Sequence, residues 1–172
     1  EEFEKILQSM YDRGFVLVSL HDIAYETTDE NGNPVFTEGN IMLPPGKQAF
    51  VMSQDDVCYY EYMEGDGFAS RMVVGEDGKP VCEMKMDDGS VSTGAYDLVP
   101  LLDEFIEEHP DFSYKGAKAV IAFTGYNGIL GYRTAASYNT DEYKAAHPDF
   151  DYEAERENAA IVAQALKDDG YE

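Results

Sequence analysis

The sequence has 172 residues and a formal net charge of −23, from 35 acidic and 12 basic side chains. Its length fits a single domain, 1–172, and a hydrophobic content of 44% is enough for a core. A field of this sign repels phosphate backbones and anionic lipids, which argues against nucleic-acid and membrane-surface binding. It suits a neutral or cationic partner, or solubility alone. No run of residues approaches the roughly 18 apolar residues that a membrane span needs.

The first part of the chain predicts a helix and two strands. Apolar residues at helical spacing predict a helix over about 2–13, which Gly14 ends. The apolar runs 15–19 and 48–53 predict strands. Between them, the polar stretch 25–40 predicts a turn. It is similar to the start of a calcium loop, but proline and asparagine occupy positions where such a loop requires glycine and glutamate.

Turn signals and helix caps organise the rest of the chain. Two Asp-Gly pairs predict hairpin turns, and hence an inserted β-hairpin or meander around 69–93. Helices are predicted over 97–108, capped by Asp97, and over 152–168, capped by Asp151. An apolar strand is predicted over 118–124. The predicted inner face of the helix over 97–108 comprises Leu98, Leu101, Leu102, Phe105 and Ile106.

The order of these elements indicates the fold class. Strands that alternate with helices, and that are apolar without alternation, predict an α/β fold with parallel strands. The last helix ends at Gly170 and is followed by Tyr171, which repeats the helix, glycine and strand junction at Gly14. We therefore expect the chain to be part of a larger α/β unit that continues beyond residue 172.

Two adjacent carboxylates, Asp55 and Asp56, follow the predicted strand 48–53. Functional groups of α/β proteins lie at the carboxyl ends of strands. Adjacent side chains point in different directions, so one carboxylate is able to bind a cation while the other accepts a proton. The pair also fits the cap of a short helix over "VCYYEYM", and the spacing alone leaves both readings open.

Residues 2–63 resemble the polysaccharide deacetylases, a carbohydrate esterase family. The resemblance lies in "FEKILQSMYDRGFVLVSLHDIA", "IMLPPGKQAFVMSQDDV" and "YYEYM", and extends more loosely over 118–170. It implies that the chain is the N-terminal part of a deacetylase-like (β/α) barrel. It also implies hydrolysis of N-acetyl or O-acetyl groups on a polysaccharide, and an extracellular or cell-surface location.

The resemblance also assigns roles to individual residues. Asp55 is the expected general base, and Asp56 the expected ligand of a divalent metal, with zinc as the expected ion. The family takes its other metal ligands from a histidine pair with H-[ST]-x-x-H spacing. His21, His109 and His147 do not have this spacing, and the resemblance places the pair just past residue 172. The chain alone is therefore expected neither to bind zinc tightly nor to release acetate.

Two departures from the family motif keep other readings open. Gln54 stands in place of its phenylalanine, and Val57 in place of its glycine. Together with the missing histidine pair, they are compatible with a catalytically inactive glycan-binding domain that keeps the fold. A structural or interaction module with an acidic surface is the third reading.

A glycine-rich loop, "TGYNGILGYRT" (124–134), closes the third strand at the same expected sheet end. Polar and aromatic side chains of such a loop are able to contact sugar hydroxyls. For Arg133 the simpler reading is an ion pair with a surface acid. The candidate substrate-binding residues are Tyr126, Asn127, Tyr132 and Arg133.

The two cysteines, Cys58 and Cys82, have no metal-ligand spacing. The sequence is equally compatible with a disulfide between them and with two free thiols.

Overall fold

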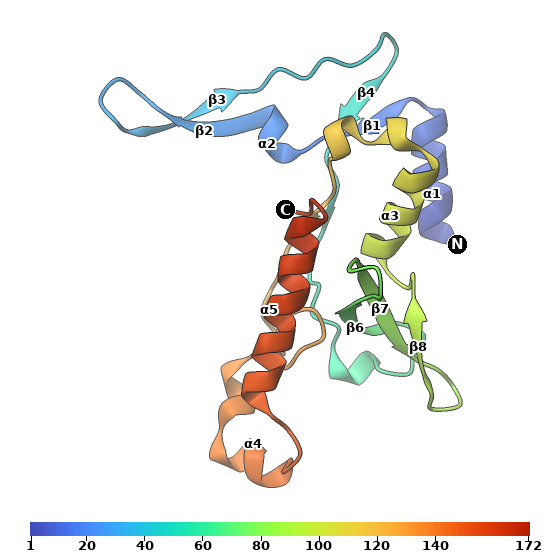
Figure 1. Ribbon diagram of the computed structural model, residues 1–172, viewed down its shortest axis with the longest axis vertical. Helices are drawn as coiled ribbons and strands as arrows, with labels where there is room; N and C mark the ends of the chain where they lie inside the picture. Colours follow the sequence, from blue (N-terminus) through green and yellow to red (C-terminus); the bar gives the residue numbers. More distant parts are fainter. The chain divides into compact units, whose positions relative to one another are not determined.

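A computed structural model describes residues 1–172, which divide into two compact units. The first unit comprises 1–53 and 102–120, and the second comprises 54–101 and 121–172. The fold is mixed α/β, with small parallel and antiparallel sheets in place of one continuous sheet (Figure 1). No helix combines the length with the apolar character that a membrane crossing requires.

The first unit confirms the predicted helix and strand pairing near the N-terminus. Helix α1 (Glu2–Asp12) ends where Gly14 adopts a positive φ of 81°. Strand β1 (Phe15–Leu17) follows, and pairs in parallel with β4 (Gln48–Phe50). The prediction of parallel strands is therefore confirmed here, although both strands are shorter than expected. Buried side chains that form the core of this unit include Leu7, Val16, Leu17, Val18, Leu102, Phe105, Phe112 and Ala119.

The polar stretch 25–40 contains a hairpin that the sequence analysis described only as a turn. A short helix, α2 (Leu20–Ile23), leads into the antiparallel strands β2 (Ala24–Thr28) and β3 (Pro34–Glu38). Asp29 accepts hydrogen bonds from the backbone N–H groups of Asn31 and Asn33 within the connecting turn. The turn itself was thus correctly predicted, but the two strands were missed. The hairpin extends as an arm from α2 (Figure 1).

The second unit contains the predicted meander. Strands β6 (Ala69–Val74), β7 (Pro80–Lys85) and β8 (Val91–Gly94) form a three-stranded antiparallel sheet. Gly78 and Gly89 adopt φ angles of 85° and 83°, which glycine reaches without steric cost, and this explains why both Asp-Gly turns form here.

The other two predicted helices are both present. Helix α5 (Tyr152–Asp168) is capped by Asp151, which accepts hydrogen bonds from two backbone N–H groups of the first turn. Helix α3 (Leu98–Glu108) begins in the second unit and continues into the first. Its most buried apolar face is rotated from the predicted one. It runs through Val99, Leu102 and Phe105, while Leu98, Leu101 and Ile106 are half-buried. The shorter helical segments are α4 (Asp141–Ala146), η1 (Glu61–Met63), η2 (Pro110–Phe112), η3 (Tyr114–Gly116) and η4 (Ala136–Asn139).

The strand that carries the aspartate pair is short. Strands β5 (Ser53–Gln54) and β9 (Val120–Ile121) form a two-stranded sheet. The N–H of Val120 donates to the carbonyl of Met52, and that of Ala122 donates to Gln54, so the two partners advance together and the strands run parallel. The predicted strand 118–124 is therefore present as a shorter element. Both strands end in the second unit, where the candidate site lies.

Candidate functional site

Asp55 and Asp56 lie directly after β5, as the sequence predicted. Asp55 is exposed, and its Oδ1 accepts a hydrogen bond of 2.8 Å from the backbone N–H of Asp56. The nearest helical segment, η1, begins at Glu61 and has no side-chain capping bond. The alternative in which the aspartate pair caps this helix is therefore wrong.

Two hydroxyl groups hold the carboxylate of Asp56. Thr124 donates to its Oδ1 at 2.5 Å, and Tyr60 donates to its Oδ2. These bonds favour the ionised form, so they lower the pKa of Asp56, with Thr124 as the largest cause and Tyr60 as the next. The same contact with Asp56 raises the pKa of Tyr60 to about 12, which keeps its phenol protonated as a donor.

Backbone strain accompanies this arrangement. Asp56 and Tyr59 adopt φ angles of 62° and 52°, and Asn127 and Leu130 in the facing loop adopt 61° and 55°. Residues other than glycine occupy this left-handed region only at a cost, and such residues cluster at functional sites. The strain indicates that the turn after β5 is held in place by its surroundings.

A cavity of about 320 Å³ opens beside the aspartate pair. At its wall, Nε2 of Gln54 donates to both carboxylate oxygens of Asp97 at 2.9 Å, and the hydroxyl of Tyr59 donates to Asp97 at 2.7 Å. Gln54 Oε1 is buried and accepts no hydrogen bond within the chain. Gln54, a departure from the family motif, therefore orients Asp97 and leaves one acceptor open. The cavity is lined by Gln54, Asp55, Asp56, Val57, Tyr59, Tyr60, Met63, Phe68, Ala69, Tyr96 and Asp97.

The loop 124–134 faces the turn after β5, and its predicted site residues take different positions. Tyr126 is exposed, and its ring centroid lies 5.6 Å from that of Tyr60. The side-chain amide of Asn127 donates to the hydroxyl of Tyr138 at 2.8 Å. Tyr132 is buried, with the guanidinium of Arg71 over its ring. Of these predicted residues, Tyr126 is the one placed beside the aspartate pair with an open ring.

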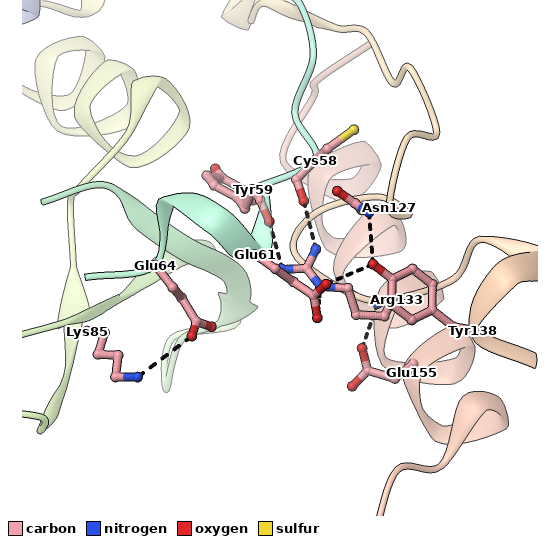
Figure 2. A network of polar contacts seen from close by, with 9 residues as sticks. All are labelled: Cys58, Tyr59, Glu61, Glu64, Lys85, Asn127, Arg133, Tyr138 and Glu155. Atoms are coloured by element: carbon pink, nitrogen blue, oxygen red, sulfur yellow. Dashed lines mark hydrogen bonds and ion pairs between the residues drawn. The ribbon is translucent and has the colours of Figure 1, made fainter. Parts of the chain in front are cut away.

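Arg133 is buried and directed at the backbone after the aspartate pair (Figure 2). Its Nη2 donates to the carbonyl of Tyr59 at 2.8 Å, and its Nη1 to that of Cys58 at 3.5 Å. Its Nε lies 3.5 Å from the carboxylate of Glu61. Figure 2 shows the guanidinium lying between these groups. The predicted ion pair with an acidic side chain is present, and the carbonyl contacts give Arg133 a bracing role.

The backbone of the same loop reinforces this contact. The N–H groups of Leu130 and Gly131 donate to the carbonyls of Val57 and Cys58. A Cβ added at Gly131 would lie 2.3 Å from that of Arg71, so glycine is required for this close approach to β6. The segment 57–61 is thus held from one side by loop backbone and Arg133.

Cys58 and Cys82 are both buried free thiols. The sulfur of Cys58 lies 3.0 Å from Oγ1 of Thr124. Burial raises the pKa of Cys82 to about 12, so this thiol stays protonated. Of the two alternatives that the sequence allowed, the structure has the free thiols.

The residues present do not assemble a zinc site by themselves. No group of three or more His, Cys, Asp or Glu side chains is placed to hold a metal ion. His109 stacks on Tyr11, and His147 stacks on Tyr143. Structural and catalytic zinc sites use at least three protein ligands, and Asp56 provides one.

Four residues of the site were not predicted from the sequence. Thr124, Tyr60 and Asp97 bond to other residues of the site, and Gln54 was noted only as a departure from a motif. The residues that these side chains bond to lie up to 68 positions away in the sequence, so no local spacing pattern connects the two partners. One signal was available, because Thr124 is the last residue of the predicted strand 118–124, whose shorter form, β9, pairs with β5.

The hydrogen bonds to Asp56 predict a measurable titration. Its pKa is lowered, so its contribution to the free energy of unfolding is present above about pH 4 and is lost as the pH falls through the lowered pKa. In the Thr124→Val variant we expect the pKa of Asp56 to rise toward the ordinary value of about 3.9. Carboxyl carbon NMR measures it directly.

Thr93→Val is the matched control, since Thr93 is exposed on β8. It should leave the titration of Asp56 unchanged. An ordinary pKa for Asp56 in the unmodified chain, or the same value with and without Thr124, would contradict this geometry.

Comparisons of the chain with protein-family models, with curated proteins and with solved structures found no match. Its function is therefore inferred from the residues and geometry of the site.

Proposed function

We propose that the chain carries the carboxylate part of a glycan deacetylase site, in a protein that hydrolyses N-acetyl or O-acetyl groups on a polysaccharide. The observation that carries the proposal is the aspartate pair after β5, with one exposed carboxylate and one held by two hydroxyls beside a cavity. The resemblance to the polysaccharide deacetylases supports this proposal. From the same resemblance we also propose a (β/α) barrel and an extracellular or cell-surface location.

Within this proposal the two aspartates differ because their surroundings differ. Asp55 is exposed and adjoins the cavity, so it is able to accept the proton of a water that attacks an acetyl carbonyl. Asp56 is oriented by Thr124 and Tyr60 and stays ionised, as a fixed negative charge requires. The attack breaks the bond from the acetyl carbon to nitrogen or oxygen. The leaving nitrogen or oxygen takes up the proton that Asp55 accepted, and acetate and an amine or alcohol are released.

A divalent ion is part of the family resemblance, but this chain supplies one of the three protein ligands that zinc takes. We accordingly propose that any metal in the active protein is completed by ligands other than these 172 residues. The 172-residue chain alone is expected to bind zinc no more tightly than its Asp56→Asn variant. Calorimetry checks this, and micromolar zinc binding lost in Asp56→Asn would contradict it.

Acetate release tests the enzymatic proposal. The substrates are N-acetylated and O-acetylated oligosaccharides, with the 172-residue chain and any longer form of the protein measured side by side. Release by a longer form, abolished by a chelator and restored by zinc, would support the proposal. No release by any form that contains the aspartate pair would remove it.

Two observations favour a second function. The absence of a metal-ligand group and the two substituted motif positions, Gln54 and Val57, suit a glycan-binding domain without hydrolysis. In that case the cavity and the neighbouring aromatic side chains bind the sugar, and no acetate is released. Oligosaccharide binding without turnover in every form of the protein would select this function.

A further inference from the structure

Three tyrosine rings form a cluster attached to the aspartate pair, and we call Tyr60, Tyr62 and Tyr126 the tyrosine platform. The rings of Tyr60 and Tyr62 are stacked, with centroids 5.3 Å apart and planes 16° apart. Tyr126 meets Tyr60 edge-on at 5.6 Å. All three belong to the second unit. The platform is therefore formed by two segments that also provide Asp56 and Thr124.

The outer rings of the platform are open. Tyr62 is 74% exposed and Tyr126 is 66% exposed, although burying a tyrosine ring is favourable. Tyr62 is stacked on Tyr60 through one face, so the other face is available to a ligand. A flat aromatic face is complementary to the C–H face of a pyranose ring, and it binds a cation through its quadrupole.

A hydrogen bond connects the platform to the carboxylates. Tyr60 is stacked with Tyr62 through its ring and donates to Asp56 through its hydroxyl. A ligand group resting on the platform therefore lies one side chain away from the aspartate pair. This connection distinguishes the platform from isolated exposed tyrosines such as Tyr25.

The segment that carries Tyr60 and Tyr62 is acidic. Residues 48–70 include five acidic and no basic side chains. Glu61 pairs with Arg133 and Glu64 with Lys85, whereas Asp55 and Asp56 form no ion pair. The uncompensated charge next to the rings favours an ammonium group and disfavours a uronate.

We propose that the tyrosine platform is a subsite for amino-sugar units with free amines, so that the protein binds partly deacetylated glycans at this position. The inference rests on the proposed function for its choice of a glycan, because deacetylation of an N-acetyl sugar leaves an amine. A glycan in which deacetylated sugar units stand beside acetylated ones places an ammonium group at the platform. A deacetylated sugar unit is therefore both the product of the proposed reaction and the neighbour of an acetylated unit that is still a substrate.

Binding of glucosamine oligomers to the 172-residue chain tests the platform, by NMR titration at a slightly acidic pH where the amines are protonated. We expect Tyr62→Ala and Tyr126→Ala each to weaken binding by about 3- to 10-fold, the range of one exposed aromatic contact. Tyr62→Phe keeps the ring and should keep the affinity. Tyr25→Ala, at 44% exposure in the first unit, is the matched control and should have no effect.

Other ligands serve as further arms of the experiment. Uronate oligomers of equal length should bind at least 10-fold more weakly, and added salt should weaken glucosamine binding. No binding of glucosamine oligomers would overturn the proposal. So would binding that is unchanged in both alanine variants, which indicates charge alone, or equally tight tyrosine-dependent binding of a lysine peptide of the same charge.

Failure of the platform and failure of the proposed activity are distinguishable. Acetate release that is lost in Asp55→Asn, with no effect of the platform variants on oligomer binding, leaves the activity and removes the subsite. Tyrosine-dependent binding of glucosamine oligomers without acetate release leaves the subsite and favours the glycan-binding function.

Discussion

Asp55→Asn is expected to lower acetate release by about 10²–10⁴-fold, the loss that follows removal of a general base. The substitution is made in the form of the protein that releases acetate. Asp55 is exposed beside the cavity, and its carboxylate accepts a hydrogen bond from the neighbouring N–H of Asp56. Asparagine keeps an acceptor for that N–H but takes no proton. The loss is therefore expected in kcat, with KM and thermal stability little changed.

Two further variants make this result specific. Asp66→Asn removes the same charge from an exposed position in the same acidic segment, and should keep activity within about 2-fold. Asp56→Asn should lose activity as well, but it also weakens the bonds from Thr124 and Tyr60. The resemblance assigns Asp56 to the metal. The zinc content of the Asp56→Asn variant should therefore fall, while that of the Asp55→Asn variant should stay unchanged. An Asp55→Asn variant with normal kcat and a lower melting temperature would make the pair structural.

Local signals in the sequence were sufficient for the second unit's meander and for the helices. Each Asp-Gly pair fixes a turn through its own backbone conformation, whatever the rest of the chain does. The cap at Asp151 acts within one helical turn. Helix α3 shows where local information ends, because its periodicity predicted a helix correctly but misplaced the most buried face. That face depends on packing partners far along the chain.

The hairpin β2–β3 was missed although it contains a hairpin signal. Asn31-Gly32 lies in its turn, and this dipeptide between alternating residues is typical of hairpins. The polar composition of 25–40 concealed the strands, because their side chains are mostly exposed and no apolar alternation results. Strand pairing here depends on backbone bonds, which the side-chain pattern does not record.

The candidate site was predictable only where it depends on local features of the sequence. The position of Asp55 and Asp56 follows from a strand end, which is a local feature. Thr124 reaches Asp56 only because β9 pairs with β5 across the sequence. Arg133 was identified as a functional candidate, and the structure places its guanidinium against backbone carbonyls. Every residue has a carbonyl, so no residue pattern marks such a partner.

Arg133→Ala is expected to lower the free energy of unfolding by about 2–4 kcal/mol. A charged donor bonded to a buried carbonyl contributes about 1.5–3 kcal/mol, and the buried arginine stem adds packing. The pair with Glu61 contributes little, because the Glu61 side chain is 53% exposed. Arg133→Lys keeps the charge but lacks the planar fork that reaches two carbonyls, and should lose about half as much.

Urea unfolding, followed by tyrosine fluorescence because the chain has no tryptophan, measures the loss. Arg156→Ala is the control, since its side chain is 58% exposed and its pair with Glu153 spans 3.9 Å. It should change the free energy of unfolding by less than about 0.5 kcal/mol. Arg133 braces the carbonyls beside Tyr60, so Arg133→Ala should also raise the pKa of Asp56 as Tyr60 loses its position. An Arg133→Ala variant as stable as Arg156→Ala would show that water replaces the guanidinium at both carbonyls, and that the strained turn is held by the loop backbone alone.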